Sequence, residues 1–244
     1  MLEVPAGSFS MGCVIGRDDE CNRDERPRHE VDLDTFFIDR TEVTVDAYRK
    51  CHDAGRCSIV GLRSQTDIGG LQVECNWGKK ERENHPINCI DWAQASAYCA
   101  WAGKRLPSEA EWEKSARGTD QRVYPWGNAR PSKETVPDLR TVSRARPSGS
   151  GPNTTWPVGS FPAGSSPYGA VDMLGNVWEW TADWFDQAAY TAAVRRNPKG
   201  PPTGTARAMR GDINAATMRI TRRSKLAPDA RLGLLGFRCA RSTP

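Results

Sequence analysis

The alternation of apolar and polar residues along the chain predicts only short elements of secondary structure. The clearest signal lies between Asp91 and Gly103, where apolar side chains recur every three or four residues and would share one helix face: Trp92, Ala95, Cys99 and Ala102. Asp91 can cap the start of this helix, and Gly103 can end it. We therefore expect a short amphipathic helix here.

Two further helices are predicted from their capping residues. Thr44 can cap a helix that ends just before Gly55. Ser108 and Glu111 form a capping box that opens a helix ending near Gly118. Strand candidates are brief and cover residues 8–11, 35–38, 158–161, 217–221 and 236–240. The rest of the chain is dense in Gly, Pro, Ser and Asn, so we expect much irregular structure.

Composition is ordinary for a globular protein and excludes two function classes. Hydrophobic residues make up 38% and charged residues 26% of the 244 residues, which is typical of such proteins. No apolar run approaches the ~20 residues of a membrane-spanning helix. The net charge of +4 is too small to indicate nucleic-acid binding. We therefore expect neither membrane insertion nor a nucleic-acid partner.

Charge is unevenly distributed along the sequence. Basic residues crowd the C-terminal quarter, whereas acidic residues crowd the start. The simpler interpretation is solvated faces with internal ion pairs, and we favour it. The alternative is a cationic surface that attracts an acidic ligand.

The chain has eight cysteines and three histidines, and no two cysteines form a Cys-x-x-Cys pair. A zinc ribbon or a thioredoxin-like motif is therefore not indicated. Disulfides are the better interpretation, and they imply an extracytoplasmic protein, periplasmic or secreted. Free buried thiols in a cytosolic protein are the alternative. Residues 1–7 show no signal-peptide pattern and open on a structured-looking segment, so we expect that a leader or an upstream domain has been removed.

Three segments carry a resemblance to a known enzyme family. They are AYCAWAGKRLPSEAEWE at residues 97–113, MLGNVWEWT at 173–181 and LGFRC at 235–239. The chain resembles the formylglycine-generating enzyme (sulfatase-modifying factor) family, whose fold is a large relative of the C-type lectin fold. The resemblance implies an irregular α/β fold of short helices and short, mostly antiparallel strands. Because it also runs across the linker-like residues 131–155, we expect residues 1–244 to form one domain with a long surface loop.

The resemblance breaks down at the family's redox centre. Active members are copper- and oxygen-dependent oxidases, with two cysteines that hold copper(I) and engage the substrate cysteine. This chain has no cysteine between Cys99 and Cys239, and only Met218 offers a soft ligand in the corresponding segment. One thioether cannot replace two thiolates, so we predict no catalytic residues.

The resemblance also implies a calcium site. The matching positions are Asp172 and Glu179 for side-chain oxygens, and Gly175 and Val177 for backbone carbonyls. Calcium prefers oxygen ligands of these kinds. The alternative is that Glu179 pairs with a nearby arginine while Asn176 closes a turn. A second calcium site of the family needs an acid in a turn that has none here, at residues 147–152.

The resemblance implies one disulfide as well. Cys99 and Cys239 correspond to a bridge that ties the family's second helix to its last strand. Cys51 and Cys57 lie at the predicted end of the first helix and favour a local bridge. Pairs Cys13–Cys21 and Cys75–Cys89 would complete the set, although sequence order chooses poorly among the possible pairings.

Three functions are open, and fold alone does not choose among them. We favour a non-catalytic recognition or sensor module, a role that the domain has in some bacterial family members. Its partner would be a protein, peptide, glycan or other anionic ligand held by the loop over residues 210–234, through partly exposed Asp212, Asn214, Arg219, Arg222, Arg223 and Arg231. The second possibility is an oxidoreductase that converts protein cysteine to formylglycine with another metal arrangement. The third is a structural, disulfide-stapled component of a larger envelope protein.

Overall fold

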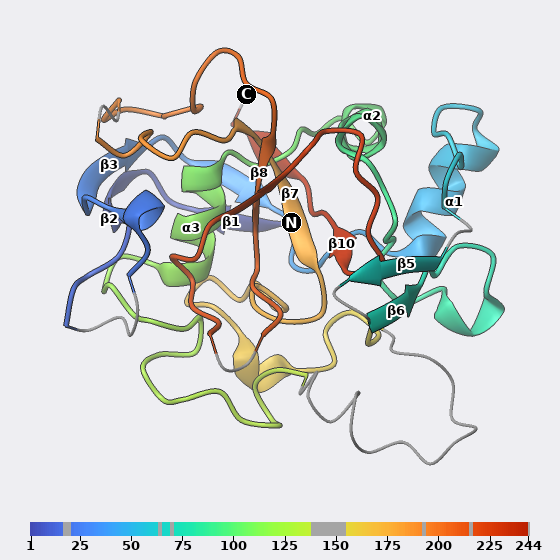
Figure 1. Cartoon of the computed structure of the whole chain (residues 1–244), viewed down its shortest axis with the longest axis horizontal. Coiled ribbons are helices and arrows are strands. Elements are labelled where there is room, and N and C mark those ends of the chain that lie inside the picture. Colours follow the sequence, from blue (N-terminus) through green and yellow to red (C-terminus); the bar gives the residue numbers. More distant parts are fainter. Residues whose placement is uncertain are drawn as a thin grey trace.

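The α-helices of the protein are short and begin at the predicted caps (Figure 1). The computed structural model describes residues 1–16, 21–62, 65–68, 71–137, 155–191, 194–214 and 217–243. Within them the α-helices are α1 (Val45–Asp53), α2 (Trp92–Trp101) and α3 (Glu109–Arg117). The Thr44 hydroxyl caps α1, and capping boxes on Asp91 and Ser108 open α2 and α3. All three helix predictions are confirmed. None of the helices in these residues is long and apolar enough to cross a membrane.

A four-stranded sheet, in the order β10–β7–β8–β9, runs through the centre of the molecule (Figure 1). Its strands are β7 (Trp178–Trp184), β8 (Arg207–Arg210), β9 (Ser224–Leu226) and β10 (Leu235–Gly236). Strand β10 is parallel to β7, and the other pairs are antiparallel. In the β7–β8 register, Glu179 lies opposite Arg210 and Trp184 opposite Arg207.

The remaining strands form three small antiparallel sheets. Strand β4 (Phe36–Ile38) lies between β1 (Leu2–Val4) and β11 (Ala240–Ser242), so strands from both ends of the chain pair with it. The two hairpins are β2 (Gly7–Met11) with β3 (His29–Leu33) and β5 (Gln65–Ile68) with β6 (Leu71–Glu74). Short 3₁₀ turns complete the described elements: η1 (Arg23–Glu25), η2 (Lys80–Arg82) and η3 (Pro162–Gly164). The architecture is mixed α/β with little regular structure, as predicted.

Two strand predictions are wrong and one is split. Residues 158–161 form a turn that leads into η3, because Pro157, Gly159 and Pro162 interrupt any ladder. Residues 217–221 also form turns and irregular chain in place of a strand. Here the side chains of Arg219 and Thr221 donate hydrogen bonds to the distant Glu25. The segment over 236–240 divides between β10 and β11.

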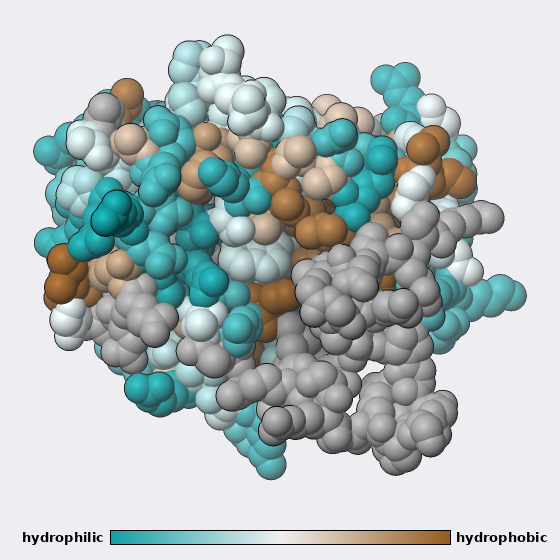
Figure 2. All heavy atoms as spheres, viewed as in Figure 1, coloured by the Kyte–Doolittle hydropathy of each residue, from teal (hydrophilic) through white to brown (hydrophobic). Residues whose placement is uncertain are grey.

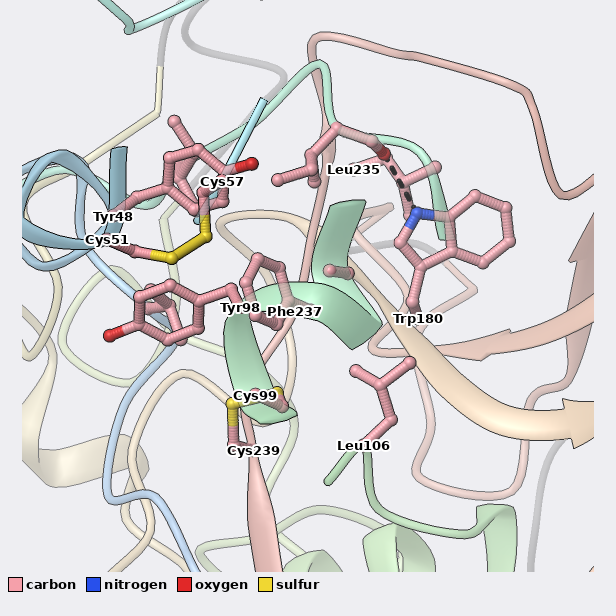
Figure 3. Packing of buried hydrophobic residues seen from close by; sticks show 14 of the residues in the cluster. Tyr48, Cys51, Cys57, Tyr98, Cys99, Leu106, Trp180, Leu235, Phe237 and Cys239 are labelled. Atoms are coloured by element: carbon pink, nitrogen blue, oxygen red, sulfur yellow. Dashed lines mark hydrogen bonds between the residues drawn. A yellow bond between two sulfur atoms is a disulfide. The ribbon is translucent and has the colours of Figure 1, made fainter. Parts of the chain in front are cut away.

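The main apolar core lies where α1 and α2 meet β7 and the C-terminal strands (Figure 3). The ring of Tyr98 packs against Phe237 and Tyr48, with centroids 5.5 and 5.6 Å apart. The Trp180 indole is fully buried and donates to the Ile90 carbonyl at 2.9 Å. Buried aromatic side chains thus supply much of the apolar area in a chain with few regular elements.

All eight cysteines are joined in disulfides: Cys13–Cys21, Cys51–Cys57, Cys75–Cys89 and Cys99–Cys239. The Cys99–Cys239 bridge joins α2 to the C-terminal segment inside the core, and Cys51–Cys57 closes the end of α1 (Figure 3). The pairing implied by the family resemblance is therefore present, and the structure contains no free thiol.

Candidate functional site

Two of the arginines expected to face a ligand lie inside the protein. Arg219 is only 3% exposed, and its Nε and Nη2 donate to the two carboxylate oxygens of Glu25, which is fully buried. The Thr221 hydroxyl donates to the same carboxylate at 2.7 Å. Arg219 therefore fastens the turn over residues 217–221 to η1, and the expectation that it is exposed is wrong.

Arg223 is buried in a second ion cluster. Its Nε and Nη2 donate to the two oxygens of Glu109 at 2.7 and 2.9 Å, and Arg210 donates to the same carboxylate at 2.9 Å. Burial alone would raise the pKa of Glu109, but the two guanidinium groups outweigh it and hold this pKa at about 2. Arg223 also lies over the ring of Tyr190, 4.4 Å from its centroid. Its role is structural, and the expected exposure is again wrong.

Asp212 is also buried, at 2% exposure. Its carboxylate accepts from the Asn214 N–H at 3.0 Å and from the Thr217 hydroxyl at 3.2 Å, and it pairs with Arg222 at 3.3 Å. Burial raises the pKa of Asp212. Asp212 therefore shapes its loop, while Arg222, with 32% of its side chain exposed, and Asn214 reach solvent.

Arg231 lies half-exposed at the start of α2. Its Nη2 pairs with the N-cap residue Asp91, and 33% of its side chain is exposed. Arg222 and Arg231 pair with different carboxylates, those of Asp212 and Asp91. Of the six residues expected to bind a ligand, the structure therefore leaves Asn214, Arg222 and Arg231 accessible. Figure 2 shows that hydrophilic residues cover much of one face of the molecule.

At the expected calcium site, Glu179 is already engaged by other side chains. Arg238 donates to its two oxygens at 2.7 Å each, and the Trp112 indole donates at 2.9 Å. Neither Glu179 nor Arg238 is exposed. This is the arginine pairing weighed above as the alternative, and a guanidinium so close leaves Glu179 little to offer a cation.

A second carboxylate lies at this site and was missed from the sequence. Glu42 is 2% exposed; Oε1 accepts from the Asn176 amide at 2.9 Å, whereas Oε2 is buried without a hydrogen-bond partner. Burial, reinforced by the neighbouring Asp172, raises the pKa of Glu42 well above its usual value. Burial likewise raises the pKa of Asp172, although the Gly159 N–H donates to its carboxylate at 2.6 Å.

Two adjacent buried carboxyl groups need a proton or a cation between them. The orphaned Glu42 oxygen beside Asp172 therefore fits a hard cation such as calcium. The fit is limited in ligand number, because the described residues contain no group of three or more His, Cys, Asp or Glu placed to hold a metal. The turn over residues 147–152, which lacks the acid of the family's second calcium site, lies outside the described residues.

The segment after β8 offers no thiolate for a soft metal. Met218, its one soft donor, is 3% exposed and packs in an apolar cluster with Trp112 and Ile220. Since every cysteine is in a disulfide, no distant thiolate can be supplied either.

Comparison with known proteins places this architecture in one family. Residues 1–243 match the sulfatase-modifying factor enzyme 1-like domain. The chain is 34% identical to the formylglycine-generating enzyme of Streptomyces coelicolor, over 98% of this chain and 88% of the relative. It is 32% identical to the inactive C-alpha-formylglycine-generating enzyme 2 of Bos taurus, over 98% and 87%.

Solved structures agree with this assignment. PvdO from Pseudomonas aeruginosa superposes with a TM-score of 0.78 at 28% identity, covering 99% of this chain and 93% of that one. The chain therefore belongs to the sulfatase-modifying factor enzyme family and has its C-type-lectin-like fold. The predictions of family and fold class are confirmed.

Proposed function

We propose that this protein is a non-catalytic recognition module built on the sulfatase-modifying factor scaffold. The observation that carries the proposal is that all eight cysteines are paired in disulfides. Copper(I) binds soft ligands, and the family resemblance implies two thiolates for the oxidase reaction. With every cysteine in a disulfide, and only the buried thioether of Met218 in the segment after β8, the chain lacks the ligands for that chemistry.

The relatives include both an enzyme and an inactive protein, so membership of the family does not settle whether this chain is catalytic. The side chains of this chain have to be considered instead. One relative is named a formylglycine-generating enzyme and another an inactive one, at similar identity to this chain. Fold alone does not decide activity. The segment after β8, where the family resemblance places the redox centre, has no cysteine and no histidine in its sequence.

The ligand we propose is an acidic peptide or glycan, bound through Arg222 and Arg231 with Asn214. Both arginines are about one-third exposed, and each is paired with a carboxylate of its own chain. An acidic ligand would compete with Asp212 for Arg222 and with Asp91 for Arg231. Such charge exchange favours specificity over high affinity.

The proposed compartment is extracytoplasmic. Four disulfides persist in oxidising surroundings and are uncommon in reducing ones. An extracytoplasmic location would also expose the recognition surface to peptides and glycans outside the cell.

We further propose that calcium binds at this site, held by the carboxylates of Asp172 and Glu42 with the carbonyls of Gly175 and Val177 that the family resemblance implies. The unpartnered Glu42 oxygen supports the choice of Glu42 in place of Glu179. The ion would neutralise two buried charges and fasten residues 172–177 to the chain before α1.

The test of the proposed function has two arms. Purified protein is incubated with copper(I), oxygen and a cysteine-bearing sulfatase peptide, with the Streptomyces coelicolor enzyme as the positive control. We expect no aldehyde from this chain. Catalytic turnover would contradict the proposal and support the alternative, that the protein is an oxidoreductase.

In the second arm, acidic peptide and glycan arrays are probed with wild type, Arg222→Ala, Arg231→Ala and the exposed control Lys50→Ala. Hits lost in the first two variants support recognition, whereas an array without hits favours a structural component.

A further inference from the structure

A separate groove lies at the other end of strand β8 from Asp212. Its volume is about 600 Å³, within the range usual for small-molecule sites. Residues from α2, β8 and the loop before α3 line it, including Trp92, Arg207 and Leu106, together with Lys199 from the chain before β8. None of the six residues predicted to bind a ligand lines this groove.

Arg207 lies in this groove with its guanidinium held between two indole rings. The guanidinium carbon is 3.7 Å from the ring centroid of Trp92 and 3.5 Å from that of Trp184. Nη1 donates to the Ala182 carbonyl at 2.7 Å. This packing on both faces fixes the plane of the guanidinium without using its charge in an ion pair.

The opposite edge of the Arg207 guanidinium has no hydrogen-bond acceptor in the part of the chain that the structure describes. Nε is buried without a hydrogen-bond partner, and Nη2 makes no hydrogen bond to any described residue. An unsatisfied buried N–H of this kind is unfavourable, and it calls for a partner that the described residues do not supply.

Other arginines of this protein use the same edge to bind a carboxylate. Nε and Nη2 together donate to the two oxygens of one glutamate in the pairs Arg219–Glu25, Arg223–Glu109 and Arg238–Glu179. The planar edge matches a carboxylate in geometry and charge. Arg207 is therefore pre-oriented like these arginines and lacks only the acid.

The charge around the groove is unbalanced toward the positive. Arg105 donates to both oxygens of Glu111 at 2.6 Å, so that pair is neutral, and Asp34 pairs with Arg196. Lys199 is exposed and has no ion-pair partner among the residues that the structure describes. Two cations, Arg207 and Lys199, therefore remain unmatched.

Asp183, in the neighbouring strand β7, is close enough to attract the Arg207 charge but does not form an ion pair with it. Burial, with a further contribution from Glu109, raises the pKa of Asp183 to about 8, so it is largely protonated at neutral pH. No salt bridge joins Asp183 to Arg207 in the described residues.

We propose that this groove binds a small organic carboxylate with an apolar body. The carboxylate receives hydrogen bonds from Nε and Nη2 of Arg207, and Lys199 adds a second positive charge. Leu33, Phe36 and Leu106 line the same groove and contact the hydrocarbon part. The site is independent of the proposed recognition surface, so either one can fail while the other stands.

The probe is phenylacetate, titrated at constant ionic strength while tryptophan fluorescence and heat of binding are recorded. Phenylacetamide, the neutral isostere, and phenylmethanesulfonate are the matched ligands. Arg207→Lys retains the positive charge between the indoles but removes the paired Nε and Nη2 donors. The affinity for phenylacetate should therefore fall about tenfold or more. Lys199→Ala should weaken binding by a smaller factor, while the exposed controls Arg195→Lys and Lys50→Ala should not change it.

Three results would overturn the proposal: no saturable binding of phenylacetate, equal binding of the amide or the sulfonate, or affinity unchanged in both groove variants. If Arg207→Lys fails to fold, Lys199→Ala carries the test, because its exposed side chain supports no packing. Unchanged affinity in that variant, together with amide binding, then rejects the carboxylate assignment.

Discussion

Arg238 donates from Nε and Nη2 to the two carboxylate oxygens of Glu179, at 2.7 Å each, and both side chains are fully buried. The pair links the last segment of the chain to the start of strand β7. Arg238 Nη2 also donates to the Val171 carbonyl at 2.9 Å, so the guanidinium is satisfied on two sides. One buried pair therefore joins the motif over residues 173–181 to the motif over 235–239.

Removing one partner of this pair should strongly destabilise the protein. In Glu179→Ala the Arg238 charge stays buried without its acid, and we expect the free energy of unfolding to fall by about 3–5 kcal/mol. The measurement is guanidinium-induced unfolding of the oxidised protein. Arg196→Ala, which breaks a pair that is 75% exposed at the arginine, should change stability by less than about 1 kcal/mol. Equal effects of the two substitutions would contradict the structural role assigned to Glu179.

Calcium should raise the thermal midpoint of the wild-type protein. Binding to the folded state alone adds about 2.7 kcal/mol at a calcium concentration of a hundred times Kd. Differential scanning fluorimetry with calcium, with magnesium and with a chelator gives the comparison. Glu42→Gln and Asp172→Asn should lose the calcium response, whereas Glu3→Gln, at an exposed position, should keep it. A midpoint that calcium leaves unchanged in wild type argues against the ion.

The two disulfides of the main core should differ in their effect on stability. The chain-entropy treatment gives about 5 kcal/mol for closing a loop the size of that between Cys99 and Cys239, and about 2 kcal/mol for the Cys51–Cys57 loop. These bridges span 140 and 6 residues. Double alanine variants of each pair, unfolded in guanidinium, test the difference. If the short bridge proves as costly to remove as the long one, local strain in α1 outweighs loop entropy.

Stability should fall with rising pH through the titration of Asp183. Burial raises its pKa from 3.8 to about 8, so the folded protein holds this proton more tightly than the unfolded chain. The contribution is complete below about pH 4 and is lost as pH rises toward 8, at up to about 1.4 kcal/mol per pH unit. Asp183→Asn stays neutral and can still accept from the Glu109 N–H. Unfolding free energies at several pH values between 5 and 8 should therefore diverge between wild type and variant; parallel curves would show that Asp183 titrates normally.

The sequence predicted the features that depend on residues close together in the chain, such as the starts of the helices. The caps Thr44, Asp91 and Ser108 determine where α1, α2 and α3 begin, because each bonds to an N–H within the next turn. Strand β7 was missed even though it lies inside a recognised motif. Its burial does not alternate along the strand, so the period-two signal of a half-buried strand is absent.

The candidate site could not be predicted in the same way, because its partners are distant in sequence. Glu25 and Arg219 are 194 residues apart, and Glu42 and Asn176 are 134 apart. Nothing in the spacing of a single sequence reveals such pairs. The C-terminal arginines therefore looked available for a ligand, when two of them neutralise buried glutamates.

The central claim is that this family member has no thiolate for copper(I), and a direct titration tests it. Purified oxidised protein is titrated with copper(I) against a chromophoric copper(I) chelator, with the Streptomyces coelicolor enzyme measured in parallel. The account predicts that the chelator keeps all of the metal in the presence of this chain. Transfer of one equivalent of copper(I) to the protein, abolished when its cysteines are alkylated, would contradict it.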